Sequence, residues 1–153
     1  MTSKVLFAAV LCGLAGTATA QTVLTVTHDD ATIEYDLAAL QALPQTEYTT
    51  ENGFIDNASV FSGPLLRDVL ELSDLLDEDT ITLKAANDYE ISYPVSDATD
   101  YDVIIATQMD GDEMSVREKG PLWLMYPFSD VPELSDGIFK SRIIWQLVEV
   151  SSQ

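Results

Sequence analysis

Short stretches of alternating apolar and polar residues dominate this chain. Nine of them are rich in valine, isoleucine, threonine and aromatic residues, which favour strands because they pack well on a pleated surface. The sequence Met109-Asp110-Gly111-Asp112 predicts a hairpin turn, since Asp and Gly readily adopt the positive φ that such a turn requires. We predict strands over residues 22–27, 32–35, 47–50, 58–61, 80–85, 90–93, 103–107, 122–126 and 143–150.

Two segments have the spacing of a helix instead. Residues 37–43 place leucines on one helical face and follow Asp36, whose carboxylate suits an N-cap. Residues 65–70 also place their apolar side chains on one helical face, and they follow Pro64, which we place in the first helical turn. Arg67 on this second helix is expected to pair with an acidic neighbour, Asp68 or Glu71. The predicted fold class is therefore α+β, with mixed β-sheets and a few short helices.

The first twenty residues have the order of a secretory signal peptide. Lys4 precedes the apolar run 5–15, and Ala18-Thr19-Ala20 forms a cleavage motif of small residues. The apolar run is shorter than the roughly 20 residues that a membrane-spanning helix needs. We therefore predict a leader over residues 1–20, a single domain over residues 21–153, no membrane span and a periplasmic or secreted location.

Negative charge dominates the predicted domain. All 26 Asp and Glu lie after residue 20 together with six Lys and Arg, so residues 21–153 carry a net charge of −20. Such a surface repels nucleic acid and anionic lipid, and we expect neither as a partner. Many carboxylates with few lysines are also typical of a halophilic protein, because a salty medium screens their mutual repulsion.

Composition excludes several kinds of catalytic chemistry. Cys12 is the only cysteine and lies in the predicted leader, so the domain has no disulfide, iron–sulfur ligand or cysteine nucleophile. His28 is the only histidine, and one histidine makes neither a two-histidine metal site nor a supported catalytic triad. We interpret His28 as a residue of a surface turn. Phosphate-loop, dinucleotide-binding and nucleophile-elbow motifs do not occur.

A succession of small motifs points to a family. In chain order they are residues 61–70 (FSGPLLRDVL), 86–89 (ANDY), 93–94 (YP), 120–127 (GPLWLMYP) and 140–145 (KSRIIW). Their order and spacing resemble the molybdopterin-binding oxidoreductase domain of the sulfite oxidase family, over about residues 37–150. The resemblance implies an α+β fold of mixed sheets. Catalytic members of the family bind a pyranopterin through its phosphate, and hold molybdenum through the pterin dithiolene and one protein cysteine.

Because of two departures from the family pattern, the resemblance supports the fold better than it supports the reaction. The cysteine ligand would fall between the first helix and Gly63-Pro64, where residues 47–54 (EYTTENGF) contain no cysteine. Neither threonine is an equivalent ligand, since a neutral hydroxyl suits a soft metal site poorly. Trp123 stands where catalytic relatives commonly carry an arginine. We therefore expect neither a metal ligand nor a cofactor in this chain, with molybdopterin as the alternative.

Basic residues indicate where a ligand would bind. Four of the six cations in residues 21–153 lie within a 26-residue stretch, beside the motifs that in the family line the pterin end of the site. Clustered positive charge attracts anions, and arginine binds phosphate or carboxylate better than lysine does. The alternative is that these cations pair with surface carboxylates. The predicted ligand-binding residues are Arg117, Lys119, Lys140 and Arg142 as the wall of a pocket, with Asn87, Asp88 and Tyr89 at its mouth.

The sequence leaves three functions open, in a definite order. The first is an exported, non-catalytic module that binds a small anionic or pterin-like molecule. The second is a molybdopterin-dependent oxidoreductase of the sulfite oxidase family, and the third is a structural or partner-binding protein. The missing cysteine favours the first over the second. Trp145, which follows two isoleucines, is assigned to the core.

Overall fold

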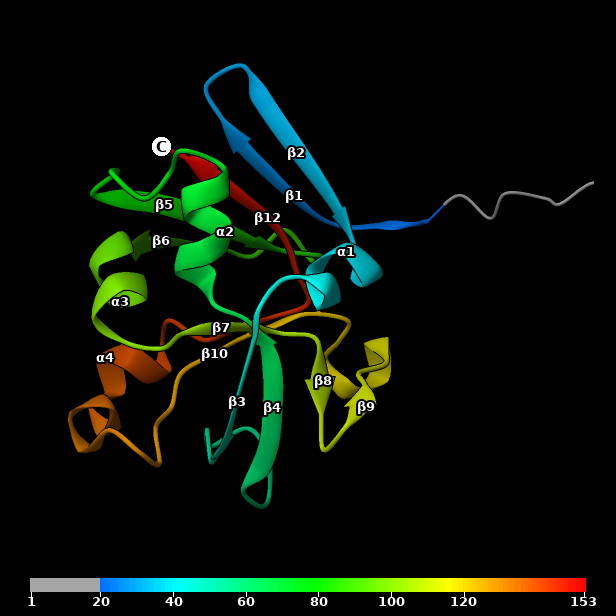
Figure 1. Cartoon of the computed structure of the whole chain (residues 1–153). Helices are drawn as coiled ribbons and strands as arrows, with labels where there is room; N and C mark the ends of the chain where they lie inside the picture. Colours follow the sequence, from blue (N-terminus) through cyan, green and yellow to red (C-terminus); the bar gives the residue numbers. More distant parts are fainter. Residues whose placement is uncertain (1–19) are drawn as a thin grey trace, which may run out of the picture.

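Three β-sheets and four short α-helices make up residues 20–153, the part of the chain that the computed structural model describes (Figure 1). The α+β class with mixed sheets is confirmed. The predicted leader lies outside the described residues except for Ala20. Within residues 20–153, none of the helices has the length and apolar character needed to cross a membrane.

The largest sheet has five strands in the order β2-β1-β12-β5-β6. β1 and β12 run parallel and the other neighbours run antiparallel, which makes the sheet mixed. Leu24 and Val26 of β1 are buried with Ile81 and Leu83 of β5, so the apolar positions of the alternating pattern face one core. The strands are β1 (Thr22–His28), β2 (Ala31–Asp36), β5 (Thr80–Ala85), β6 (Glu90–Pro94) and β12 (Leu147–Ser152).

Two smaller sheets complete the core. One has the order β3-β4-β8-β9 and the other β11-β10-β7, whose central strand is buried throughout. The predicted hairpin turn is confirmed between β8 and β9, where Asp110 and Gly111 have φ of 54° and 86°. The strands are β3 (Gln45–Thr50), β4 (Ser59–Pro64), β7 (Ile104–Ala106), β8 (Gln108–Met109), β9 (Asp112–Glu113), β10 (Trp123–Met125) and β11 (Ile144–Trp145).

The helices are short, and only two of them were foreseen. Asp36 caps the first as predicted, since its carboxylate accepts a hydrogen bond of 2.7 Å from the backbone N–H of Ala39. Pro64 ends β4 rather than starting the second helix, which begins at Leu66 because the chain is still paired with β3 at that point. The helices are α1 (Leu37–Ala42), α2 (Leu66–Leu72), α3 (Val95–Asp100) and α4 (Gly137–Lys140), with 3-10 turns η1 (Val116–Glu118) and η2 (Pro132–Ser135).

The long C-terminal strand expected over residues 143–150 is divided in two at Gln146. This residue has a φ of 52°, which turns the chain from the three-stranded sheet into the five-stranded one. Its backbone N–H donates to the carbonyl of Lys119 at 3.0 Å, and its carbonyl accepts from Ala86 at 2.9 Å. Three segments that are distant in sequence therefore meet beside β11.

Two glycines of the family-like motifs stand where chain segments almost touch. A Cβ atom on Gly63 would lie 2.0 Å from the carbonyl oxygen of Ile105, and one on Gly120 would lie 2.0 Å from that of Met114. Only glycine fits either place, since real Cβ atoms do not approach backbone so closely. Close backbone packing thus explains why glycine stands in the Gly63-Pro64 and Gly120-Pro121 motifs.

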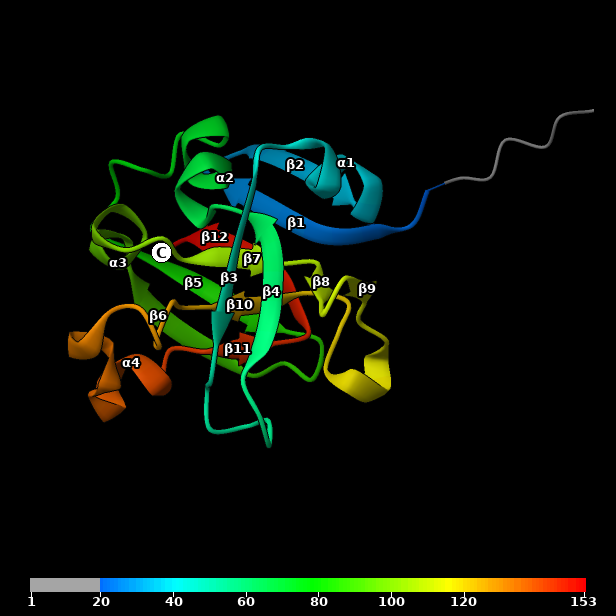
Figure 2. The ribbon, with the colours of Figure 1, turned by 60° about the horizontal axis from the view of Figure 1, so that its bottom comes forward.

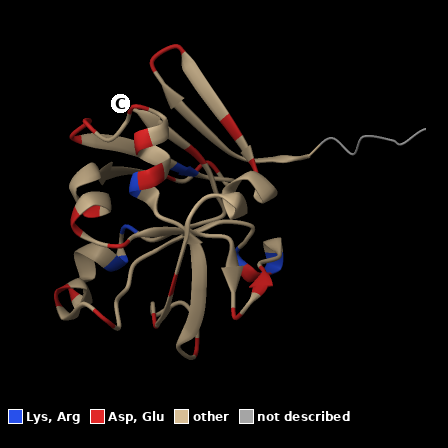
Figure 3. Cartoon of the chain, in the orientation of Figure 1, with Lys and Arg blue, Asp and Glu red and all other residues tan. Residues whose placement is uncertain are grey.

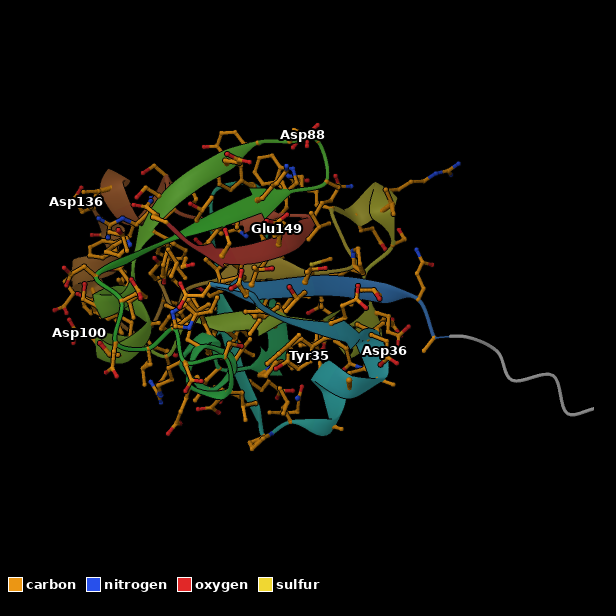
Figure 4. All side chains as sticks on the ribbon, turned by 90° about the horizontal axis from the view of Figure 1, so that it is seen from above. Tyr35, Asp36, Asp88, Asp100, Asp136 and Glu149 are labelled. Atoms are coloured by element: carbon orange, nitrogen blue, oxygen red, sulfur yellow. The ribbon has the colours of Figure 1, made fainter. Side chains whose placement is uncertain are left out.

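Acidic residues cover the exterior. Figure 3 shows red segments on most loops and helices and only a few blue ones. Figure 4 places Asp88, Asp100 and Asp136 at the periphery, each on a different part of the chain. Because the formal net charge is −19, these carboxylates repel one another in the folded state.

We expect the folded state to become more stable as salt is added. The Debye length falls from about 30 Å at 0.01 M to about 3 Å at 1 M salt, which screens repulsion between exposed carboxylates. Thermal unfolding should therefore show a higher Tm in molar sodium chloride than in 10 mM. The gain should shrink near pH 4, close to the sequence pI of 4.1, where the net charge is small. A Tm that is flat or falls with salt at neutral pH contradicts this expectation.

Candidate ligand-binding site

A cavity of about 320 Å³ opens beside β11. Figure 2 shows α4 and β11 on the same side of the molecule as the loop that joins β3 to β4, and all three contribute to its lining. Its volume lies at the lower end of the range for small-molecule pockets, about 300 to 1,000 Å³. We call it the aromatic cavity. Its lining residues are Phe54, Ala85, Asn87, Tyr89, Lys140, Ser141, Ile143, Ile144 and Trp145.

Three of the predicted ligand-binding residues, Asn87, Tyr89 and Lys140, line this cavity together. Asn87 accepts a hydrogen bond of 3.2 Å from the backbone N–H of Tyr89 through its side-chain oxygen, which leaves the amide NH₂ as a donor. Asp88 does not line the cavity. It occupies a left-handed turn position with φ of 64° and pairs with Lys84 at 3.2 Å, a contact that raises the pKa of Lys84.

Lys119 contacts the wall of the cavity without lining it. Its Nζ lies 4.9 Å from the ring centroid of Trp145 and 5.4 Å from those of Phe54 and Trp123. It also donates a hydrogen bond of 3.2 Å to the backbone carbonyl of Phe54. An ammonium over ring faces is attracted by their π electrons, by about 0.5–1 kcal/mol at exposed sites. Lys119 therefore holds two lining rings in place.

The two predicted arginines lie elsewhere. Arg142 donates from Nη1 to Asp97 Oδ2 at 2.6 Å, and Tyr126 donates to the same oxygen at 2.7 Å. Asp97 is only 6% exposed, so this ion pair is largely buried. Arg117 is exposed on η1. The structure thus brings Lys140 and Lys119 to the cavity, and it does not bring the arginines to its wall.

Half of the basic residues of the predicted domain have no acidic partner. Arg142 and Lys84 are paired with Asp97 and Asp88, as described above. Arg67 pairs with Asp102 at 2.8 Å. This differs from the expected pair with a helix neighbour, because the chain before β7 passes beside α2. Within the part of the chain that the structure describes, the remaining three form no ion pair with a carboxylate. They are Arg117, Lys119 and Lys140.

A second cavity has the opposite charge. It measures about 370 Å³ and is lined by five carboxylates, with no basic residue among the described residues that line it. By contrast, the aromatic cavity has one lysine and, within residues 20–153, no Asp or Glu in its lining. An anion is therefore repelled by one cavity and tolerated by the other. The five carboxylates are Glu47, Asp100, Asp102, Asp130 and Glu133.

Two buried tyrosines surround the Arg142–Asp97 pair. Burial raises the pKa of Tyr126 and Tyr93 well above the ordinary value of 10.0, and the Asp97 carboxylate raises both further. The hydroxyl of Tyr93 has no hydrogen-bond partner in the described part of the chain. Both rings therefore favour the neutral phenol in the folded state.

Alkaline conditions should unfold the protein through these tyrosines. A folded-state pKa above the unfolded value of 10.0 means that the stabilisation is complete below pH 10 and is lost as the pH rises beyond it. We expect tyrosinate absorbance and loss of circular dichroism to rise together above pH 10. Exchanging the exposed Tyr89 for phenylalanine should leave this transition unchanged. Titration of all six tyrosines near pH 10 with full retention of structure contradicts the prediction.

The residues at the expected metal position do not fit a thiolate-bound molybdenum. Residues 47–54 contain no cysteine. Thr50 is buried, and its hydroxyl is already engaged, donating to the Glu51 carbonyl at 3.2 Å and accepting from the Ser129 N–H at 3.3 Å. Among residues 20–153, no three His, Cys, Asp or Glu side chains are grouped so as to hold a metal ion.

Comparison with known proteins identifies the family. The family model for the oxidoreductase molybdopterin binding domain matches residues 17–129, and the chain belongs to this family. Its structure is similar to the crystal structure of the sulfane dehydrogenase SoxCD from Paracoccus pantotrophus, with a TM-score of 0.63 and 17% sequence identity. That match covers 84% of this chain and 37% of the SoxCD chain. Comparison with curated protein sequences finds no match.

Three of the cavity residues that the sequence missed are aromatic or polar. Phe54 follows the left-handed Gly53 in a loop without any periodic signal, and Ser141 lies between two basic residues that drew attention instead. Trp145 was assigned to the core but is only half-buried, since one side of β11 faces the cavity. A cluster of aromatic residues near unpaired lysines is the signal that would have found two of them.

Proposed function

We propose that this chain is an exported, non-catalytic member of its family that binds a small anionic or pterin-like molecule in the aromatic cavity. The observation that carries the proposal is the charge of the lining. In a chain with 26 acidic residues, the described residues that line this cavity include a lysine and no carboxylate. The net charge of the chain repels an anion, so a lining without carboxylates is where an anion meets the least opposition.

Lys140 supplies the attraction. Its ammonium forms no ion pair with any described residue, and it is the one charged side chain among the described residues that line the cavity. Charge-assisted hydrogen bonds to an anion are roughly twice as strong as neutral ones. The amide NH₂ of Asn87 adds a second donor on the same cavity. Together these two residues suit a carboxylate or a phosphate.

The non-catalytic part of the proposal rests on two places in the chain. Residues 47–54 supply no thiolate, and the hydroxyl of Thr50 is committed to backbone partners. Trp123, where catalytic relatives commonly carry an arginine, is 1% exposed and packs edge-on against Phe61 and Trp145. Neither place offers the group that a reaction at molybdenum would use.

Protein purified from a molybdenum-replete host tests this proposal. We expect elemental analysis to find no stoichiometric molybdenum, and intact mass to show native material that begins at Gln21. Near one-to-one molybdenum overturns the non-catalytic assignment and supports the oxidoreductase, while a mature chain that retains Lys4 overturns the export.

The binding itself is tested by a thermal-shift screen of carboxylates, phosphates and pterins. We expect stabilisation of the wild type that is lost in Lys140→Gln and kept in Arg117→Gln, which removes the same charge outside the cavity lining. Equal responses of both variants contradict the proposed site.

A further inference from the structure

Resting on the proposed function, we infer that the ligand of the aromatic cavity is a flat aromatic carboxylate of one or two fused rings. The rings of the ligand lie against Phe54, Tyr89 and Trp145, and its carboxylate is held by Lys140 and Asn87. The inference follows from the kind of surface that the cavity presents, from its free hydrogen-bonding groups and from its size.

The aromatic wall is exposed where aromatic side chains are normally buried. Phe54 is 43% exposed and Tyr89 is 52% exposed, and both line the cavity with the half-buried Trp145. Phe54 and Trp145 meet at 5.2 Å between ring centroids with an interplanar angle of 64°. Leaving such rings in water is unfavourable, and each aromatic pair contributes about 0.5–1.5 kcal/mol beyond its buried area. A flat ring covers these surfaces better than an aliphatic chain.

Two of the three rings of the wall are held before any ligand arrives. The Lys119 ammonium lies over both Phe54 and Trp145, and it is bonded to the Phe54 backbone. A preformed surface lowers the entropy cost of binding. Lys119 is therefore a positioning residue, which acts on the ligand through the two rings.

Lys140 and Asn87 present free donors to the cavity. The Lys140 ammonium has only N–H donors, and the Asn87 amide NH₂ is free while its oxygen accepts from Tyr89. The ligand atoms that meet them must be acceptors, and the charge on Lys140 favours an anion. Because a single cation lines a cavity of about 320 Å³, a compact ligand with one negative charge fits best.

Titration calorimetry with matched probes tests the inference. Naphthalene-2-carboxylate has both ring and charge, acetate lacks the ring, 2-naphthylmethanol lacks the charge, and 2-naphthylmethylamine reverses it. We expect naphthalene-2-carboxylate and pterin-6-carboxylate to bind, and the other three to bind at least tenfold more weakly. Lys140→Gln and Tyr89→Ala should each weaken naphthalene-2-carboxylate about tenfold, whereas Arg117→Gln, outside the cavity lining, should leave it unchanged.

The outcomes separate this inference from the proposed function. If acetate or phosphate binds as tightly as naphthalene-2-carboxylate and depends on Lys140, the aromatic inference fails and the anion-binding module stands. If the alcohol or the amine binds as tightly as the carboxylate, the inference is overturned. If no anion binds, both fail. Lys119→Met should weaken the carboxylate while Lys119→Arg restores it, and equal affinity for the Met variant contradicts the positioning role.

Discussion

Replacing Gly63 with alanine is expected to lower the free energy of unfolding by about 3 kcal/mol, the upper end of the usual range for overpacking. The new Cβ would lie 2.0 Å from the carbonyl oxygen of Ile105 and 2.9 Å from the Cα of Ala106. Both are backbone atoms of the central region of the core, so they cannot rotate away as a side chain would. Relief requires β4 to separate from β7.

Gly137→Ala is the matched control for this change. A Cβ atom there meets nothing within 4 Å, and Gly137 is the first residue of α4. Alanine should leave stability unchanged or raise it by up to about 1 kcal/mol, because it restricts the unfolded chain. Urea unfolding followed by circular dichroism measures both variants. A Gly63→Ala protein as stable as Gly137→Ala contradicts the close approach of β4 and β7.

Removing the side chain of Arg142 is expected to cost a similar amount, about 3 kcal/mol, because breaking a buried ion pair leaves an uncompensated charge. Of the described residues, only Tyr126 would still donate a hydrogen bond to the Asp97 carboxylate, which is 6% exposed. Arg67→Ala is the control, since its Asp102 partner is exposed and such pairs contribute at most about 1 kcal/mol.

The same variants separate a structural from a ligand-binding role for Arg142. A structural role predicts that Arg142→Ala loses stability without any ligand, and that adding Asp97→Ala recovers part of the loss. Urea unfolding of the single and double variants measures this. If Arg142→Ala keeps full stability but loses anion affinity, Arg142 binds the ligand and the structural role is wrong.

Local signals in the sequence predicted local structure. The carboxylate of Asp36 caps α1 because the cap and its N–H partner are three residues apart, and the turn at Asp110 and Gly111 depends only on their own φ angles. The alternating segments located the strands for the same reason. By contrast, α3 (VSDATD) has few apolar residues to repeat at helical spacing, and α4 is four residues long, about one helical turn.

The roles of the site residues could not be predicted locally, because they depend on contacts between residues that are distant in sequence. Arg142 and Asp97 are 45 positions apart, and no local pattern reveals that this arginine is already occupied. Likewise, the ammonium of Lys119 meets Phe54 across 65 positions. The cluster of cations includes Lys140, which lines the cavity. Which of the four cations lines it was decided by the folded backbone, since Arg142 turns to Asp97 and Arg117 lies on η1.

An amide NMR map of the protein titrated with naphthalene-2-carboxylate tests the binding site most directly. We expect saturable shifts at Asn87, Tyr89, Lys140 and the indole N–H of Trp145, with Tyr101 and Glu133 of the acidic cavity unmoved. Shifts centred on the acidic cavity, or the absence of saturable shifts around Lys140, would contradict the proposed site.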